Sequence, residues 1–381
     1  MARRSRTRVG WNLLALRREA LGGWVYVQGI LDAAAAHDAG WQLTAFVTEE
    51  SRLLVQHLTS VELVQLRVRS DIRALRVAAE HALLPVLAKR HELSCLHNFS
   101  GTAPPLRGLA TALTVYDLLI FHRPASTTRL KRWYLRHAVP ASIQRADALL
   151  PISEATAADV RRHFPVGRAH VAVIPPIIGK GWYPATDAEC AALRQEFSLP
   201  PKFWLYVAAG YEHKNHHGLF HALAILRAAG HEPWPLVLRG VQLELQIRRA
   251  AEFGVADLVH IAPPMNQDQM RVLIGAAAAC IFPSLFEGAG IPGLEAMACA
   301  APLIASDIPT SREFLSGYAE LFDPSDPHQI AEAMLRVQRN PPVRDGLRAL
   351  GNRQLQRQRP AAVASTLFSA YDAAISRSIN S

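Results

Sequence analysis

Short apolar segments alternate with helical segments along most of this chain, and the alternation limits the folds that it can adopt. In the first half we predict strands at residues 9–16, 42–47, 63–68, 93–96, 112–116, 148–152 and 170–174. Helical stretches separate most of them, notably residues 72–90 and 156–163. Strands that alternate with helices predict an α/β fold with a doubly wound parallel sheet. Ligands bind such sheets at the carboxyl ends of the strands.

A proline- and glycine-rich stretch at residues 175–201 interrupts this pattern, and a second series follows it. Its predicted strands are residues 203–208, 236–238, 258–261, 280–282 and 303–305. Its predicted helices are residues 216–229, 243–253 and 266–279, with one more from residue 327. A chain of 381 residues is long enough for two domains. We therefore predict one domain at residues 1–176, a second at 177–360 and a C-terminal helix at 361–381.

The composition is that of an ordinary soluble globular protein, with 50% hydrophobic and 19% charged residues. The net charge of +9 favours an acidic partner: nucleotide phosphates, nucleic acid or an anionic membrane surface. The four cysteines lie far apart and form no C-x-x-C pair. This spacing indicates reduced thiols and no zinc site.

The N-terminal residues 1–8 are basic, as at the start of a signal peptide, but the apolar stretch at residues 11–16 is too short for one. No run approaches the roughly 20 apolar residues of a membrane span. We therefore expect a cytoplasmic protein, with peripheral attachment to the inner face of the membrane as an option. Residues 128–137 mix cations and aromatic side chains at helical spacing, which suits an anionic membrane surface. A solvated helix with one buried stripe is the alternative.

Two carboxylates, Glu287 and Glu295, flank a glycine-rich turn within residues 281–302. An apolar run precedes the turn, and Pro292 suits the first turn of a helix. A strand, a glycine-rich loop and a helix start are therefore expected in that order, with Glu287 in the loop and Glu295 in the first helical turn. Free backbone N–H groups and the positive end of the helix dipole would face a ligand above the loop. The alternative is a plain turn with a carboxylate that stabilises the helix.

Residues 283–298 read Pro-Ser-Leu-Phe-Glu-Gly-Ala-Gly-Ile-Pro-Gly-Leu-Glu-Ala-Met-Ala. This segment closely resembles the signature of the family 4 retaining glycosyltransferases of the GT-B type, which are glycosyl transferases of group 1. Two positions depart from the usual pattern, since Ala289 replaces a Phe and Ala300 replaces a frequent Gly. The resemblance implies two facing Rossmann-like domains with a cleft between them, and a last helix that crosses back to the first domain.

The resemblance also implies roles for this segment. Glu295 would accept hydrogen bonds from the ribose hydroxyls of a nucleotide sugar, and Glu287 would lie beside the sugar. Backbone groups would complete the donor site, at Gly288, Gly290, Ile291, Pro292 and Leu294.

Lys214 follows the first strand of the second domain, within the sequence Gly-Tyr-Glu-His-Lys-Asn. The family often has Gly-x-x-x-Arg-Lys-Asn here, and its Lys binds the donor diphosphate. A lysine at the end of a strand is a suitable counter-charge for a diphosphate, although a solvated surface lysine is the ordinary alternative. His213 stands where the Arg is usual, and Arg239 is a candidate for the missing cation.

The first domain carries weaker matches. Gly22 and Gly23 resemble the Gly-Gly of a family loop that approaches the donor phosphates and the acceptor, and an ordinary tight turn is the alternative. Tyr116 and Asp117 align with a His-Asp-Leu motif whose His lies near the transferred sugar. Tyr116 replaces that His, whereas Asp117 keeps its place and is expected to orient the acceptor or the loop. His122 is another candidate for the missing histidine, with a surface histidine as the alternative.

No Asp-x-Asp triplet occurs in the sequence, so we expect no metal and no cofactor besides the donor substrate. We predict a retaining hexosyltransferase that transfers a mannose-like or glucose-like sugar from a nucleotide diphosphate sugar to a saccharide or lipid-linked acceptor. The resemblance points to bacterial surface polysaccharide or lipopolysaccharide synthesis. The predicted catalytic residues are Glu287, Lys214, Asp117 and Tyr116.

Two other interpretations stay open. The first is a basic nucleic-acid-binding protein on a Rossmann-like scaffold, although we expect no nucleic-acid partner because no RNA-binding signature is present. The second is a catalytically impaired glycosyltransferase relative, which the departures at His213, Ala289 and Tyr116 suggest.

Overall fold

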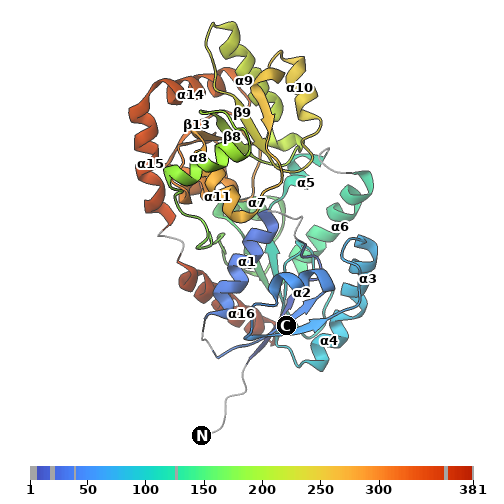
Figure 1. Ribbon diagram of the computed structural model, residues 1–381. Helices are drawn as coiled ribbons and strands as arrows, with labels where there is room; N and C mark the ends of the chain where they lie inside the picture. The colour runs from blue at the N-terminus through green and yellow to red at the C-terminus, as the bar shows by residue number, and fades with distance from the viewer. Residues whose placement is uncertain (1–6, 18–21, 38–39, 125–127, 356–358, 380–381) are drawn as a thin grey trace. The chain divides into compact units, whose positions relative to one another are not determined.

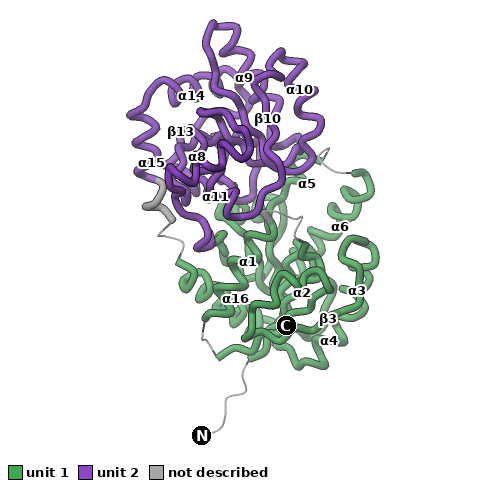
Figure 2. The backbone as a smooth tube through the Cα atoms, viewed as in Figure 1, with its two compact units in different colours: residues 1–177, 358–381 green, residues 178–357 purple. Residues whose placement is uncertain are grey.

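The computed structural model describes residues 7–17, 22–37, 40–124, 128–355 and 359–379. The chain divides into two compact units, residues 1–177 with 358–381 and residues 178–357 (Figures 1 and 2). Unit 2 is one stretch of chain, whereas unit 1 is built from two stretches. Most of the basic N-terminal segment, residues 1–6, lies outside the described residues. None of the helices among the described residues combines the length and apolar character that crossing a membrane requires.

Unit 1 contains a seven-stranded sheet in the order β3-β2-β1-β4-β5-β6-β7. Its strands are β1 (Arg8–Asn12), β2 (Gln42–Val47), β3 (Val61–Gln65), β4 (Cys95–Asn98), β5 (Ala110–Val115), β6 (Ala148–Pro151) and β7 (His170–Val171). All neighbouring pairs are parallel, and the order reverses between β1 and β4. The predicted doubly wound α/β sheet is thus confirmed. Strand β1 ends earlier than predicted because the backbone turns after Asn12, where Leu16 N–H donates to the Leu13 carbonyl.

Helices cover both faces of this sheet (Figure 1). They are α1 (Gly22–Ala35), α2 (Glu49–Val55), α3 (Arg73–Ala82), α4 (Leu84–Arg90), α5 (Leu119–His122), α6 (Arg129–Arg145), α7 (Glu154–His163) and α16 (Pro360–Ile379). The single helix predicted at residues 72–90 is wrong, since α3 and α4 are separate helices that meet at Leu83. Pro85 lies in the first turn of α4 and explains the break, because proline has no N–H and clashes with the preceding turn.

The C-terminal helix α16 belongs to unit 1, although the whole of unit 2 precedes it in the sequence (Figure 2). It packs against α1 and against strands β4, β5, β6 and β7. Its Tyr371 is fully buried, and the hydroxyl lies 2.7 Å from Nδ1 of His97 and 3.2 Å from Nε1 of Trp11. Nε2 of His97 lies 2.8 Å from the hydroxyl of Thr114. Every polar atom of this buried group is therefore paired, and α16 is fixed on the sheet.

Unit 2 contains a six-stranded parallel sheet in the order β10-β9-β8-β11-β12-β13. Its strands are β8 (Trp204–Val207), β9 (Leu236–Arg239), β10 (Val259–Ile261), β11 (Ala279–Phe282), β12 (Leu303–Ser306) and β13 (Ala319–Phe322). Its α-helices are α8 (Asp187–Glu196), α9 (His216–Ala228), α10 (Gln246–Glu252), α11 (Gln267–Ala276), α12 (Ile291–Ala298), α13 (Pro309–Leu315), α14 (Pro327–Arg339) and α15 (Pro341–Leu355). Helix α13 and strand β13 were not predicted from the sequence, because both are short and β13 is mostly half-buried.

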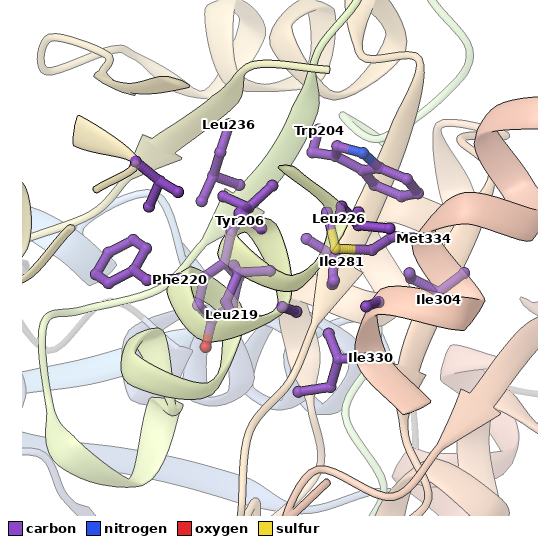
Figure 3. Close-up of a cluster of buried hydrophobic side chains, with 14 of the residues drawn as sticks. Trp204, Tyr206, Leu219, Phe220, Leu226, Leu236, Ile281, Ile304, Ile330 and Met334 are labelled. Atoms are coloured by element: carbon purple, nitrogen blue, oxygen red, sulfur yellow. The ribbon is translucent and has the colours of Figure 1, made fainter. Parts of the chain in front are cut away.

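One core cluster of unit 2 lies where α9 and α14 pack together beside the sheet (Figure 3). Trp204 and Tyr206 of β8 and Ile281 of β11 contribute from the strands, and all three are at most 1% exposed. The helices contribute Leu219, Phe220, Leu226, Ile330 and Met334. Apolar burial stabilises by about 25 cal/mol per Å². This cluster therefore fixes β8 and β11 side by side, which places the loops that follow them at one edge of the sheet.

A buried cation connects α8 with α11. The Arg271 side chain is 1% exposed, and its Nη2 lies 2.6 Å from Oε1 of Glu189 and 2.9 Å from Oδ1 of Asp268. The guanidinium also lies 4.1 Å from the ring centroid of Tyr183. Two carboxylates and one aromatic ring thus compensate the charge of a side chain that has lost its water.

Candidate active site

A pocket in unit 2 lies at the point where the strand order reverses, because the first and fourth strands of the unit, β8 and β11, are neighbours there. Open α/β sheets bind ligands at the carboxyl ends of the strands at such a reversal point. Several of the lining residues are polar side chains or glycines: Tyr206, Lys214, Ser284, Glu287, Gly290, Gly293 and Ser311. Pro292 also lines it. Three predicted donor-site positions of the signature, Glu287, Gly290 and Pro292, therefore meet Lys214 in one pocket, whereas the predicted Gly288, Ile291 and Leu294 lie outside its lining.

Lys214 and Glu287 form a direct ion pair in this pocket. Nζ of Lys214 lies 2.6 Å from Oε1 of Glu287, and the two side chains are 17% and 20% exposed. Burial by itself would raise the pKa of Glu287, but the charge of Lys214 and its hydrogen bond lower that pKa below the ordinary value. His213 lowers it further, more weakly. The carboxylate is therefore ionised at neutral pH. From the sequence the two residues were predicted to contact different parts of a ligand, and their pairing was not predicted.

The segment that carries Lys214 is held firmly in place. Lys214 ends the short 3-10 helix η3 (Glu212–Lys214), and its carbonyl accepts a 2.6 Å hydrogen bond from the buried hydroxyl of Tyr206. Asn215 follows in the left-handed conformation, at φ 57°, and caps α9. Its amide donates to the carbonyls of Pro283 and Pro324, at 3.0 and 2.8 Å. Asn215 thus connects the Lys214 segment to the loops that follow β11 and β13, a structural role that was not predicted from the sequence.

Helix α12 begins at the glycine-rich loop, as the sequence predicts. Gly290 precedes it at φ 65° and ψ 43°, a left-handed conformation that a side chain would strain. Because the helix starts at Ile291, Glu295 is its fifth residue and lies in the second turn rather than in the predicted first turn. Ala289, at the position of the usual Phe, is 4% exposed.

Glu295 differs from Glu287 in its surroundings. It is 7% exposed, lies outside the pocket lining, and no hydrogen-bond donor pairs with its carboxylate among the described residues. Burial raises the pKa of Glu295 to about 8. In the absence of a ligand this carboxyl group is therefore mostly protonated at neutral pH. A hydroxyl-rich ligand could supply the hydrogen bonds that the protein does not.

The raised pKa of Glu295 predicts a pH-dependent stability. The folded chain keeps a proton on Glu295 up to about pH 8, whereas the unfolded chain releases it near its ordinary value of 4.5. The contribution to stability is thus full below pH 4.5 and decreases as the pH rises towards 8. We expect the free energy of unfolding of Glu295→Gln to match that of the parent at pH 5. Above pH 8 it should exceed that of the parent by about 2–4 kcal/mol, since each pKa unit corresponds to 1.36 kcal/mol. Urea unfolding at both pH values tests this.

The control for that comparison is Glu332→Gln, which alters an exposed carboxylate on α14. An equal effect of Glu295→Gln at pH 5 and above pH 8 would contradict the raised pKa.

The remaining predicted donor residue, Arg239, ends β9 beside β8. Its Nη1 donates a 3.1 Å hydrogen bond to the Gly240 carbonyl, and burial lowers its pKa. Arg239 lies outside the pocket lining, so the structure does not bring it together with Lys214. Ser284, by contrast, lines the pocket and lowers the pKa of Glu287 by a hydrogen bond. It stands inside the signature, three residues before Glu287, which is the signal that could have identified it.

The predicted residues of unit 1 lie at the start of α1 and directly after β5. Gly22 and Gly23 begin α1 rather than forming a turn, so their N–H groups are among those that a helix start leaves without helical partners. The Tyr116 hydroxyl donates a 2.8 Å hydrogen bond to the Phe99 carbonyl, and burial raises its pKa. Oδ1 of Asp117 accepts a 2.9 Å hydrogen bond from the N–H of Leu119 at the start of α5. The side chains of Tyr116 and Asp117 thus each make a hydrogen bond to the backbone that helps to hold the segment after β5.

Two family models match the chain. The model described as Glycosyltransferase Family 4 matches residues 22–178, and that described as Glycosyl transferases group 1 matches residues 192–353. Together they cover most of both units.

The chain is 30% identical over 273 residues to the serotype-specific mannosyltransferase WbdA of Escherichia coli, and the alignment covers 69% of this chain and 33% of WbdA. It is 24% identical over 247 residues to the O-antigen chain mannosyltransferase RfbU of Salmonella typhimurium, with 63% of this chain and 64% of RfbU covered. The chain thus spans less than two thirds of the length of either relative.

Solved structures share the fold over nearly the whole chain. Sucrose-phosphate synthase from Thermosynechococcus elongatus has a TM-score of 0.74 at 19% identity, with 96% of this chain and 98% of the synthase covered. Anabaena HepE in complex with UDP and glucose has a TM-score of 0.72 at 16% identity, with 95% and 98% covered. WaaG, a glycosyltransferase involved in lipopolysaccharide biosynthesis, has a TM-score of 0.71 at 17% identity, again with 95% and 98% covered. The chain therefore belongs to the family 4 glycosyltransferases, the glycosyl transferases of group 1, and its two Rossmann-like units have the GT-B fold.

Proposed function

We propose that this protein transfers mannose from a nucleotide diphosphate mannose to a saccharide or lipid-linked acceptor, with retention of the anomeric configuration, in the synthesis of a bacterial surface polysaccharide such as an O-antigen. The observation that carries the proposal is the Lys214–Glu287 pair in the pocket at the reversal point of unit 2. Two relatives, WbdA and RfbU, are mannosyltransferases by name, which supports mannose over glucose. HepE, with the same fold, holds UDP and glucose.

The Lys214–Glu287 pair suggests how the donor is bound. An incoming diphosphate brings two or more negative charges to the Lys214 ammonium, which then exchanges its carboxylate partner for phosphate oxygens. Glu287 is released from its hydrogen bond and turns to the hydroxyls of the sugar. Because Lys214 supplies a positive charge where the leaving group becomes negative, it stabilises the transition state more than the bound donor. The backbone N–H groups at the start of α12 add to this stabilisation.

The pocket lining agrees with a retaining mechanism, because Glu287 is the one carboxylate among the described residues that line it. In this mechanism the leaving phosphate accepts the proton of the acceptor hydroxyl, and the new glycosidic bond forms on the face from which the phosphate departs. Glu287 stabilises the positive charge that develops on the sugar. Asp117 and Tyr116 of unit 1 remain predicted acceptor-side residues, and Glu295 a predicted ribose ligand.

A panel of sugar nucleotides tests the proposal. We expect a nucleotide diphosphate mannose to raise the melting temperature of the protein and to be hydrolysed slowly or transferred, and the product to keep the α configuration of the donor, as judged by proton NMR. A β-linked product would contradict retention. Stabilisation by a glucose nucleotide alone would contradict mannose, and no response to any sugar nucleotide would contradict the function. Calorimetry on Glu295→Ala tests the ribose role, since an unchanged nucleotide affinity would exclude it.

The acceptor side of the proposal includes a membrane surface formed by α6 with α3. Leu130 and Trp133 of α6 are 78% and 64% exposed, and Leu75 of α3 is 52% exposed. Lys131 of α6 and Arg73 of α3 lie close enough for the charge of Arg73 to lower the pKa of Lys131, after the larger effect of burial. Apolar side chains among cations match the interface of an anionic bilayer, where tryptophan is enriched.

Vesicle flotation checks this surface. We expect the protein to float with phosphatidylglycerol vesicles, to dissociate at high salt, and to bind phosphatidylcholine vesicles poorly, because each surface cation adds about 1 kcal/mol with anionic lipid. The double variant Leu130→Ser with Trp133→Ser should lower the bound fraction at least about tenfold through lost apolar burial. Leu53→Ser on α2, where Leu53 is 59% exposed, is the control. Equal binding to both kinds of vesicle would overturn the proposal.

A further inference from the structure

Two histidines and one carboxylate meet in unit 1 where α5 and α7 end. Nε2 of His122 lies 2.7 Å from Oδ2 of Asp159, and Nδ1 of His163 lies 3.1 Å from Oδ1 of the same aspartate. The two imidazole centroids are 5.0 Å apart. One possible ligand atom from each of the three residues lies within 4.8 Å of the other two. None of these residues belongs to the pocket of unit 2.

The cluster rests on a rigid base. Phe121 and Phe164, the chain neighbours of the two histidines, pack edge to face with their ring centroids 5.0 Å apart. Both also pack against a buried cluster that includes Leu118 and Val160. The ends of α5 and α7 are thus held together by apolar contacts and bring the histidines into place without needing an ion. Asp159 and His163 lie one turn apart on α7, which puts them on the same face of that helix.

The ligand atoms of the three residues, all within 4.8 Å of one another, lie near the spacing of a metal site. A tetrahedral Zn²⁺ ion with ligands at about 2.0–2.1 Å keeps the ligand atoms roughly 3.3 Å apart. The two histidine–aspartate distances of 2.7 and 3.1 Å need only small side-chain rotations to reach that value. The side chain of Asp159 is 14% exposed and those of the histidines about a third, so an ion could enter from solvent and keep a water ligand.

We propose that His122, Asp159 and His163 bind one divalent transition-metal ion, with Zn²⁺ as the best match to two imidazoles and one carboxylate. The ion would replace the hydrogen bonds that now join these side chains with metal–ligand bonds. The negative end of the α7 dipole adds a favourable field for a cation. Helix α5 follows Tyr116 and Asp117 in the sequence. An ion bound at this site would join α5 to α7 and so hold the segment from Tyr116 to His122 in a single conformation. The site is independent of the proposed sugar transfer.

Titration of the full chain with zinc chloride tests the site, after removal of any affinity tag and treatment with a chelator. We expect calorimetry to give one ion per chain and the melting temperature to rise with zinc concentration, because a ligand that binds only the folded state stabilises it. Cobalt chloride should give visible absorption bands of a four-coordinate ion. We expect His122→Ala and His163→Ala each to weaken zinc binding at least about tenfold, and the double variant to abolish it.

His57→Ala is the matched control, because Nε2 of His57 also lies 2.8 Å from an aspartate, Asp32, in unit 1. This variant should keep full affinity for zinc. Equal zinc affinity of the parent and the double variant, or no binding by the parent, would overturn the proposal. Asp159→Asn provides a second route, since it keeps the shape of the side chain and should weaken binding at least about tenfold. The melting temperature without metal shows whether each variant folds.

Discussion

Replacing Lys214 with alanine will lower the rate of sugar transfer by at least about two orders of magnitude. The substitution removes the cation that is 2.6 Å from Glu287 in the pocket and that we expect on the leaving diphosphate. It also removes the charge that lowers the pKa of Glu287, so burial will raise that pKa and favour the neutral acid. Both effects act on the transition state, and the turnover number should therefore fall more than the affinity for the donor.

Glu287→Ala should cause a loss of similar size, because the carboxylate is expected to stabilise the charge on the sugar. Initial rates with a sugar nucleotide donor measure both effects. Lys202→Ala, which alters an exposed lysine of unit 2, is the control and should leave the rate unchanged. Near-normal rates for Lys214→Ala or Glu287→Ala would sink the assignment of the pocket, provided that circular dichroism shows the variants to be folded.

The second large effect concerns stability, and we expect Arg271→Ala to lower the free energy of unfolding by about 3 kcal/mol. Hydrogen bonds to charged groups contribute about 1.5–3 kcal/mol each. Arg271 makes two sets of them, with Glu189 and Asp268, but both carboxylates are partly exposed, at 39% and 71%, and water will replace part of the interaction. The lost stacking on Tyr183 adds to the cost. Melting temperatures should fall by roughly 6–12 °C, at about 2–4 °C per kcal/mol for a unit of this size.

Arg271→Met separates packing from charge in this prediction. Methionine keeps most of the buried volume and loses the ion pairs, so a variant as unstable as Arg271→Ala would assign the effect to charge. The exposed ion pair of Arg227 with Asp257 provides the control, because Arg227 is 40% exposed and Arg227→Ala should change stability by less than about 1 kcal/mol. An effect of Arg271→Ala below 1 kcal/mol would contradict the structural role of the buried cation.

The sequence was most informative where hydrophobic pattern and local geometry agree. β2 is buried at five consecutive positions, and its predicted bounds are those observed. β1 was predicted too long because Leu13, Leu14 and Leu16 are also buried, although the backbone has already turned. Burial alone does not distinguish a strand from a buried turn. The break between α3 and α4 could have been predicted from the sequence, because Pro85 lies directly after it.

The site was predictable in its parts but not in its pairing. The glycine-rich loop and the helix after it were predicted. The left-handed backbone of Gly290 was not predicted, although a glycine at a helix start is compatible with it. The Lys214–Glu287 contact joins residues 73 positions apart, and no local pattern encodes which groups meet across a sheet edge. The same holds for His122 and Asp159, which lie 37 positions apart. The spacing of Asp159 and His163 on one helix was visible in the sequence, but the third residue was not.

The position of α16 at the end of the sequence affects how unit 1 folds during synthesis on the ribosome. A ribosome must add all of residues 178–357 before it begins the helix that packs on β4 to β7 and pairs with Trp11 and His97. During that interval the nascent first sheet has no cover over this face, and its buried polar groups lack the hydroxyl of Tyr371. Unit 2, an uninterrupted stretch, can complete its own core first. In newly made chains, the uncovered sheet of unit 1 is therefore the part most prone to aggregation and to binding by chaperones.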